Sequence, residues 1–185
     1  MALRLYAATT SQGKLRDFRA AAEAHALSIE PLPGLKIIPA PEENGLTFSE
    51  NARLKAVYYS RFAPGELVLA DDSGLTDSPD ANDNTDVWNN IVLLQRLVGV
   101  PPCRRTARYR SVLAVARDGE VLHTAEGEVG GLILGAPRGM GGFGYDPLFY
   151  LPALQLTMAE IDLETKNTLS HRGRAIQELL PKLGL

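Results

Sequence analysis

Residues 67–75 read Leu67-Val-Leu-Ala-Asp-Asp-Ser-Gly-Leu75, an apolar run that leads into two adjacent carboxylates. This pattern is typical of a buried strand that delivers charge to the edge of a sheet. A strand alternates its side chains between faces, so Asp71 and Asp72 have different roles unless the backbone turns, and Ser73-Gly74 predicts such a turn. In open α/β sheets, ligands bind outside the carboxyl ends of strands, where this pair is expected. The same residues are ordinary in a solvated turn, so other segments must decide between the two interpretations.

The composition indicates one globular domain over residues 1–185. The chain has 185 residues, 45% of them hydrophobic, which is enough for one substantial core, and its net charge of -3 gives no electrostatic reason to expect nucleic acid as a partner. We find neither an export signal nor an apolar run long enough for a membrane span. The single Cys103 excludes an internal disulfide and argues against a cysteine-type zinc site. We therefore expect a cytoplasmic protein that does not bind membranes.

The N-terminal segment predicts a strand, a polar loop and a helix. Residues 3–8 form the apolar strand, residues 9–14 read Thr-Thr-Ser-Gln-Gly-Lys, and a helical pattern follows at Leu15, Phe18, Ala22 and Ala26. A loop of this kind exposes backbone N–H groups at the positive end of a helix dipole, so phosphate is its natural ligand. It is not a Walker A loop, because Lys14 is followed by leucine. A plain helix cap would explain the same residues.

A second helix is predicted to begin near Phe48. Thr47 and Glu50 form a capping box before it. Asn51 and Lys55 are four residues apart and share one helix face, from which Lys55 could reach a ligand. A solvated lysine is the alternative interpretation.

Two carboxylates, Glu42 and Glu43, precede this helix in a loop. A loop carboxylate near the aspartate pair would complete an oxygen-rich magnesium site. An acidic surface loop would account for the same residues.

The central part of the chain predicts a scaffold of one helix and two long strands. Residues 75–86 are rich in turn formers and predict a mobile loop, and residues 88–97 predict a helix that ends before Pro101-Pro102. Residues 107–117 and 120–134 predict two strands joined by a hairpin at Asp118-Gly119.

The glycine-rich segment 139–147 reads Gly-Met-Gly-Gly-Phe-Gly-Tyr-Asp-Pro. So many glycines suggest a backbone that approaches another group closely while presenting Phe143 and Tyr145. A flat base would suit this surface, although glycine-rich turns also occur without ligands.

The C-terminal segment predicts two further helix starts. Thr157 and Glu160 have the spacing of a second capping box, and Ser170 is placed to cap a last helix. The core face of that helix is predicted at Ala175, Ile176, Leu179, Leu180 and Leu183. His171 and Arg172 lie in its first turn, where cations oppose the helix dipole, and a ligand carbonyl or phosphate would explain them.

Taken together, five segments resemble the inosine triphosphate pyrophosphatase family, the noncanonical purine nucleotide pyrophosphatases also called Ham1-like proteins. They are residues 8–14 (Ala-Thr-Thr-Ser-Gln-Gly-Lys), 42–52 with Lys55, 70–75 (Ala-Asp-Asp-Ser-Gly-Leu), 142–147 (Gly-Phe-Gly-Tyr-Asp-Pro) and 170–173 (Ser-His-Arg-Gly). The motifs are in the family's order and span nearly the whole chain. The resemblance implies an α/β fold with a central mixed, bent sheet flanked by helices and a cleft between two lobes, and it implies a homodimer.

The implied reaction is magnesium-dependent hydrolysis of a purine nucleoside triphosphate between the α and β phosphates. The resemblance assigns substrate binding to Thr9, Thr10, Ser11, Gln12, Gly13, Lys14, Lys55, Ser73, Phe143, Gly144, Tyr145, Asp146, Lys166, His171 and Arg172. It assigns the metal to Glu42 and Asp72, and the attacking water to Asp72, with Asp71 as a second candidate. Phe143 is expected to stack on the base, and the cations at its edge favour a 6-oxo group over a 6-amino group. The implied role is removal of deaminated purine nucleotides.

This sequence departs from the family in two places. Ser11 stands where the family usually has asparagine, and the segment from Thr76 to Val87 is shorter than in the family. The short segment is either a true deletion or a stretch missing from the sequence in hand, and a true deletion would put lid closure in question.

Three alternatives remain open at this point. The chain could hydrolyse a pyrimidine or another modified nucleotide, or it could be a nucleotide-binding module with impaired catalysis. A purely structural protein would leave the glycine-rich aromatic turn and the cations of the last helix unexplained.

Overall fold

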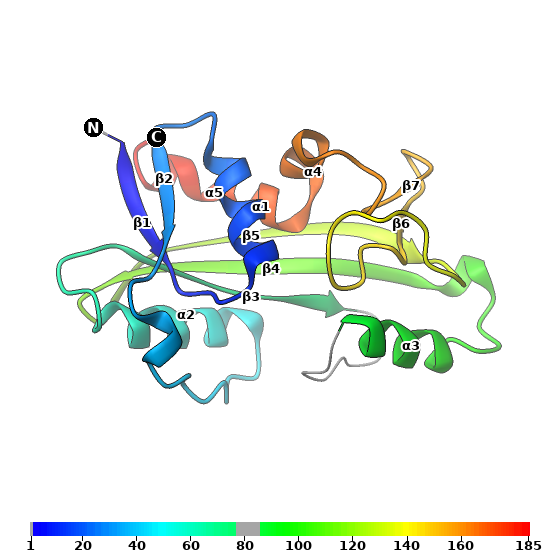
Figure 1. Ribbon diagram of the computed structural model, residues 1–185, viewed down its shortest axis with the longest axis horizontal. Coiled ribbons are helices and arrows are strands. Elements are labelled where there is room, and N and C mark those ends of the chain that lie inside the picture. The colour runs from blue at the N-terminus through cyan, green and yellow to red at the C-terminus, as the bar shows by residue number, and fades with distance from the viewer. Residues whose placement is uncertain (1, 77–85) are drawn as a thin grey trace. The chain divides into compact units, whose positions relative to one another are not determined.

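The computed structural model describes residues 2–76 and 86–185 (Figure 1). Most of the loop that was predicted to be mobile, residues 75–86, lies outside these residues. The elements in chain order are β1 (Leu3–Ala7), α1 (Gln12–Ala22), β2 (Leu27–Pro31), the 3-10 turn η1 (Leu35–Ile37), α2 (Phe48–Ser60), β3 (Val68–Thr76), α3 (Asp86–Arg96), the 3-10 turn η2 (Pro102–Arg104), β4 (Thr106–Arg117), β5 (Glu120–Ile133), β6 (Phe149–Leu151), β7 (Leu156–Thr157), α4 (Leu163–Leu169) and α5 (His171–Lys182). No helix among the described residues is long and apolar enough to cross a membrane.

The strands form one mixed sheet in the order β2-β1-β3-β4-β5-β6-β7. Strand β1 pairs in parallel with β2 and β3, whereas β6 pairs antiparallel with β5 and β7. Both residues between β4 and β5, Asp118 and Gly119, have positive φ angles of 51° and 87°, as a two-residue hairpin requires. The predicted α/β class, the mixed sheet and this hairpin are confirmed. The predicted cleft between lobes stays a prediction.

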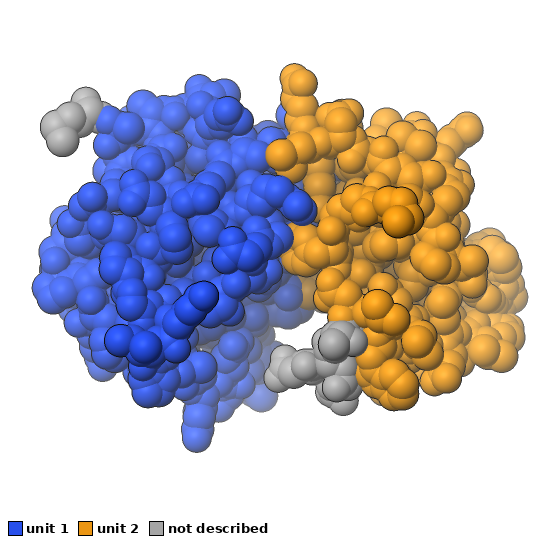
Figure 2. All heavy atoms as spheres, in the orientation of Figure 1, with its two compact units in different colours: residues 1–73, 110–128, 167–185 blue, residues 74–109, 129–166 orange. Residues whose placement is uncertain are grey.

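The chain divides into two compact units, coloured separately in Figure 2. Unit 1 comprises residues 1–73, 110–128 and 167–185. In this unit α1 and α5 pack on one face of the sheet, where Phe18 and Ile176 are buried with Leu5 and Leu113 (Figure 1). Helix α2 covers the other face with small residues that include Ala52. Unit 1 is therefore a three-layer α/β/α body.

Unit 2 comprises residues 74–109 and 129–166. Its core includes the stacked rings of Tyr109 and Phe149, with centroids 4.3 Å apart and planes at 21°. Leu93 of α3 and Met158 are buried in the same unit. Strands β3, β4 and β5 each contribute residues to both units.

Three local predictions are wrong. Strand β3 continues through Ser73-Gly74 to Thr76, because pairing within the sheet outweighs the local turn preference of these two residues. No helix begins directly after Thr157, which ends β7, although Glu160 Oε2 accepts a hydrogen bond from the Thr157 N–H at 2.8 Å. Helix α1 ends at Ala22, and Ala26 is exposed beyond it.

Candidate active site

The polar loop after β1 ends in the cap of α1. Ser11 is the N-cap residue, and its Oγ accepts a hydrogen bond from the Lys14 N–H at 3.3 Å. Thr9 Oγ1 in turn accepts from the Ser11 N–H at 3.2 Å. Residues 12–14 therefore form the first helical turn, and this helix N-terminus is a favourable place for phosphate.

Lys14 forms an ion pair with the first aspartate of β3. Its Nζ lies 2.8 Å from Asp71 Oδ2, and the Asp71 side chain is only 3% exposed. Burial alone would raise the pKa of Asp71, but the nearby Lys14 and Arg172 more than offset it and lower that pKa below its usual value. Asp71 is therefore ionised in the folded protein, and its carboxylate pairs with the Lys14 ammonium.

Lys55 joins the second aspartate to the loop before α2. Its Nζ lies 3.0 Å from Asp72 Oδ1 and 3.0 Å from Glu43 Oε2. Burial lowers the pKa of Lys55, but Asp72, Asp71 and Glu43 together raise it above its usual value. Of the two loop carboxylates, Glu43 is the one that shares Lys55 with Asp72, and both Glu42 and Glu43 are exposed.

A cavity of about 380 Å³ in unit 1 brings many of the predicted phosphate-binding residues together. It is lined by Ala8, Thr9, Thr10, Ser11, Lys14, Leu35, Lys36, Ile38, Ala40, Glu43, Lys55, Tyr59 and Asp71. Three of these residues are lysines, and Lys36 was not identified from the sequence. The cavity therefore combines hydroxyl donors, a helix N-terminus and positive charge.

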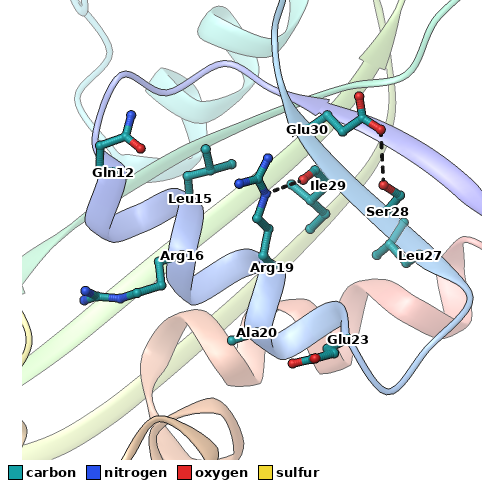
Figure 3. A pocket seen from close by; sticks show the side chains of 10 residues that line it. All are labelled: Gln12, Leu15, Arg16, Arg19, Ala20, Glu23, Leu27, Ser28, Ile29 and Glu30. Atoms are coloured by element: carbon teal, nitrogen blue, oxygen red, sulfur yellow. Dashed lines mark hydrogen bonds between the residues drawn. The ribbon is translucent and has the colours of Figure 1, made fainter.

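Gln12 lines a different cavity, of about 560 Å³, between α1 and β2 (Figure 3). There Arg19 Nε donates to the Ile29 carbonyl at 2.8 Å, and Ser28 Oγ donates to Glu30 Oε1 at 3.4 Å. These polar groups already pair with one another, and no other predicted site residue lines this cavity. We therefore do not assign it to the candidate site.

The carboxylates around Lys55 are chemically suited to magnesium. Among the described residues, no group of three or more His, Cys, Asp or Glu side chains is placed to hold a metal ion. Mg²⁺, however, is usually bound by one or two carboxylates together with substrate phosphates and water. Asp72 and Glu43 converge on one cationic group, so their oxygens supply the donor type and negative charge that such an ion needs.

Arg172 has protein partners that the sequence did not reveal. Its Nη1 lies 3.4 Å from Asp17 Oδ2, and its Nη2 donates to Ser73 Oγ at 3.0 Å. Ser73 Oγ donates to Asp71 Oδ2 at 3.0 Å. The cation at the start of α5 therefore has a protein partner within unit 1, the buried Asp17, while its predicted contact with a ligand stays a prediction. His171 is buried beside it.

Unit 2 holds a second group of predicted residues around the glycine-rich turn. Asp146 Oδ2 accepts from Lys166 Nζ at 2.7 Å and from the Phe143 N–H at 2.9 Å. Lys166 Nζ lies 5.3 Å from the centre of the Phe143 ring. Burial, with a contribution from Asp86, raises the pKa of Tyr145, although Arg96 lowers it. Asp146 and Lys166 are both buried, so Asp146 holds the lysine and the aromatic turn in place.

Comparison with known proteins shows what this chain is similar to. The sequence matches the Ham1 family over residues 5–182. It is 56% identical over 203 aligned residues to a dITP/XTP pyrophosphatase of Acidobacterium capsulatum, covering 99% of each chain. It is 42% identical to a dITP/XTP pyrophosphatase of Geobacter sulfurreducens, covering 98% of this chain and 96% of the relative.

Two solved structures with a similar fold are those of Ham1 proteins. A HAM1 protein from Coxiella burnetii has a TM-score of 0.81 and 32% identity, covering 98% of both chains. The Ham1 protein of Staphylococcus aureus has a TM-score of 0.79 and 32% identity, with the same coverage. The order of the motifs, the fold and the full-length similarity lead to one conclusion: this chain belongs to the Ham1 family.

Proposed function

We propose that this protein hydrolyses noncanonical purine nucleoside triphosphates, ITP, dITP and XTP, to the monophosphate and pyrophosphate. The observation that carries the proposal is the pair of lysines, Lys14 and Lys55, that face a cavity at the N-terminus of α1 and are each bound to an aspartate of β3. The relatives named dITP/XTP pyrophosphatase support the choice of substrate.

The triphosphate would bind in this cavity of unit 1. The hydroxyls of Thr9, Thr10 and Ser11 and the first turn of α1 supply donors to the phosphate oxygens. Lys14 and Lys55 would neutralise the charge that builds on the pyrophosphate leaving group. Because both ammonium groups are already bound to carboxylates, each is held in position before the substrate arrives.

Asp72, with a carboxylate of the loop before α2, would hold Mg²⁺. The sequence resemblance assigns that loop ligand to Glu42, and the contact with Lys55 makes Glu43 a second candidate. When bound, the ion would supply positive charge to the phosphate oxygens and lower the pKa of a coordinated water.

Of the two aspartates, Asp72 is better placed to orient the attacking water. Its side chain is 15% exposed, whereas that of Asp71 is 3% exposed and bound to Lys14 and Ser73. Asp72 therefore takes the role of general base, and Asp71 that of a support for Lys14.

The base would be recognised at the glycine-rich turn of unit 2. Phe143 is half-buried and offers its ring for stacking, and the Lys166 ammonium lies close to that ring. A hydrogen-bond donor at this edge pairs with a 6-oxo group but leaves a 6-amino group unmatched, which penalises adenine. The roles of Gly144, Tyr145, His171 and Arg172 in base binding stay predictions.

The physiological role that follows is removal of deaminated purine nucleotides from the cytoplasm before polymerases use them. We further propose a homodimer. Light scattering coupled to size-exclusion chromatography would test it, with twice the 20.0 kDa chain mass expected.

To test the activity, the protein is incubated with magnesium and one nucleotide per reaction: ITP, XTP, GTP, ATP or CTP. The products of each reaction are resolved by chromatography. We expect monophosphate and pyrophosphate from ITP and XTP, with ATP almost untouched. Turnover of CTP alone would favour a pyrimidine substrate. Nucleotide binding without pyrophosphate release would favour a binding module with impaired catalysis.

A further inference from the structure

Helix α3 binds both backbone polar groups of one residue in the glycine-rich turn. Asp86 Oδ2 accepts a hydrogen bond from the Gly144 N–H at 2.8 Å. Asn90 Nδ2 donates to the Gly144 carbonyl at 3.0 Å. Asp86 and Asn90 are four residues apart, so they occupy one face of the helix. We refer to these two side chains as the α3 clamp.

The clamp acts on the residue that follows Phe143. The Phe143 N–H is itself held by Asp146 Oδ2 at 2.9 Å, so the backbone is fixed on both sides of the aromatic ring. Gly144 has a φ of +62°, a left-handed conformation that L-residues seldom adopt. The clamp therefore stabilises an unusual backbone conformation next to the side chain proposed to stack on the base.

The residue types of the clamp are not explained by the helix alone. Asparagine is a poor helix former because its side chain competes for backbone groups. Asn90 nevertheless stands in the middle of α3, where its amide reaches the Gly144 carbonyl. Aspartate in the first turn suits the helix dipole, but the dipole does not require that Asp86 also accept from a distant N–H.

We propose that Asp86 and Asn90 are positioning residues that hold Phe143 in place for stacking on the purine base. This inference rests on the proposed function, because it concerns binding of the base by the same protein. Both residues and the turn that they bind belong to unit 2, whereas the proposed phosphate-binding residues belong to unit 1, so we expect the clamp to act on substrate binding and selection and to leave the hydrolytic step unchanged.

The first test compares Asn90→Ala and Asp86→Ala with Gln95→Ala, which removes an exposed side chain from the same helix. Since base–aromatic stacking strengthens substrate binding, partial loss of it should raise KM for ITP by about 5–10-fold. We expect kcat to stay within about twofold of the wild type. The Gln95→Ala control should match the wild type in both constants.

The second test separates positioning from a general structural effect. In a Phe143→Ala background the clamp has no ring left to position, so adding Asn90→Ala should produce no further rise in KM. A rise of the same size in both backgrounds would overturn the proposal.

Amide hydrogen exchange gives a readout that does not depend on activity. Asp86→Ala should accelerate exchange of the Gly144 N–H, while the Gln95→Ala control leaves it unchanged. Unchanged exchange at Gly144 would overturn the proposal. If the wild type is active and the clamp variants behave like Gln95→Ala, the proposal for the clamp is overturned and the proposed function stands. If the wild type is inactive, the proposed function is overturned together with the proposal for the clamp.

Discussion

Asp71 and Asp72 are neighbours on β3 but take part in different ion pairs. Asp71 reaches Lys14 of α1, and Asp72 reaches Lys55 of α2, because successive side chains of a strand point to opposite faces. The sheet therefore divides two chemically identical groups between a buried structural position and a more accessible one. This division leads to a separate prediction for each residue.

Asp71→Asn should destabilise the protein in a pH-dependent way. Because the pKa of Asp71 is lowered in the folded state, its carboxylate contributes stability above its ordinary pKa of 3.8, and this contribution is lost as the pH falls through the lower native pKa. We expect the variant to lose about 1–3 kcal/mol of unfolding free energy at neutral pH. Urea unfolding of both proteins from pH 7 to pH 3 would measure the difference, which should shrink below pH 3.8. A difference that grows on acidification would contradict this assignment.

Asp72→Asn should abolish turnover while the protein stays folded. Removing a general base lowers kcat by about 10²–10⁴-fold, and the amide retains the size of the carboxylate. The measurement is pyrophosphate release from ITP, together with a thermal unfolding curve. Glu30→Gln, which neutralises an exposed carboxylate of β2, serves as the control and should keep wild-type kcat. Near-normal activity of the Asp72 variant would remove this residue from the mechanism.

At the scale of the elements, β5 lies directly against the start of α5. A Cβ added at Gly127 would lie 2.1 Å from the His171 carbonyl oxygen and 2.5 Å from the Ala175 nitrogen. No side chain fits between the strand and the helix there. Because Gly127 has no side chain, β5 and the first turn of α5, which carries His171 and Arg172, can pack in direct contact.

Gly127→Ala should therefore destabilise the protein, by about 1–3 kcal/mol, because the helix backbone must move to relieve the overlap. Gly130→Ala is a matched control on the same strand, since a Cβ there meets nothing within 4 Å. The control should lie within about 0.5 kcal/mol of the wild type. Chemical denaturation of the two variants measures both effects, and equal stabilities would show that α5 does not require this close packing.

The sequence predicted most elements because their local patterns agree with the fold. The capping box of Thr47 and Glu50 and the hairpin at Asp118-Gly119 have short-range causes, and both are confirmed. The turn predicted at Ser73-Gly74 is wrong because the sheet overrides a local preference. Asp17 was missed for a different reason: its partner, Arg172, is 155 residues away, and no helical period identifies such a pair.

At the scale of the whole molecule, substrate binding and folding are thermodynamically linked. A ligand that binds only the folded chain stabilises it by about 2.7 kcal/mol at a concentration of 100 Kd. For a chain of 185 residues this corresponds to a rise in Tm of about 5–11 °C. The relevant ligand is an ITP analogue with an imido group between the α and β phosphates, since it blocks the bond that is to be cleaved.

With magnesium, the ITP analogue should raise Tm over this range, and the matching ATP analogue at the same concentration should raise it far less. The two ligands have the same phosphate chain and sugar, so the difference would arise at the base, where the proposed donors of unit 2 would match only the 6-oxo group. In the Lys166→Met variant the preference for inosine over adenosine should shrink. Differential scanning fluorimetry of both proteins with both analogues measures this directly. Equal shifts for the two analogues with the wild-type protein would place base selection outside the glycine-rich turn and Lys166.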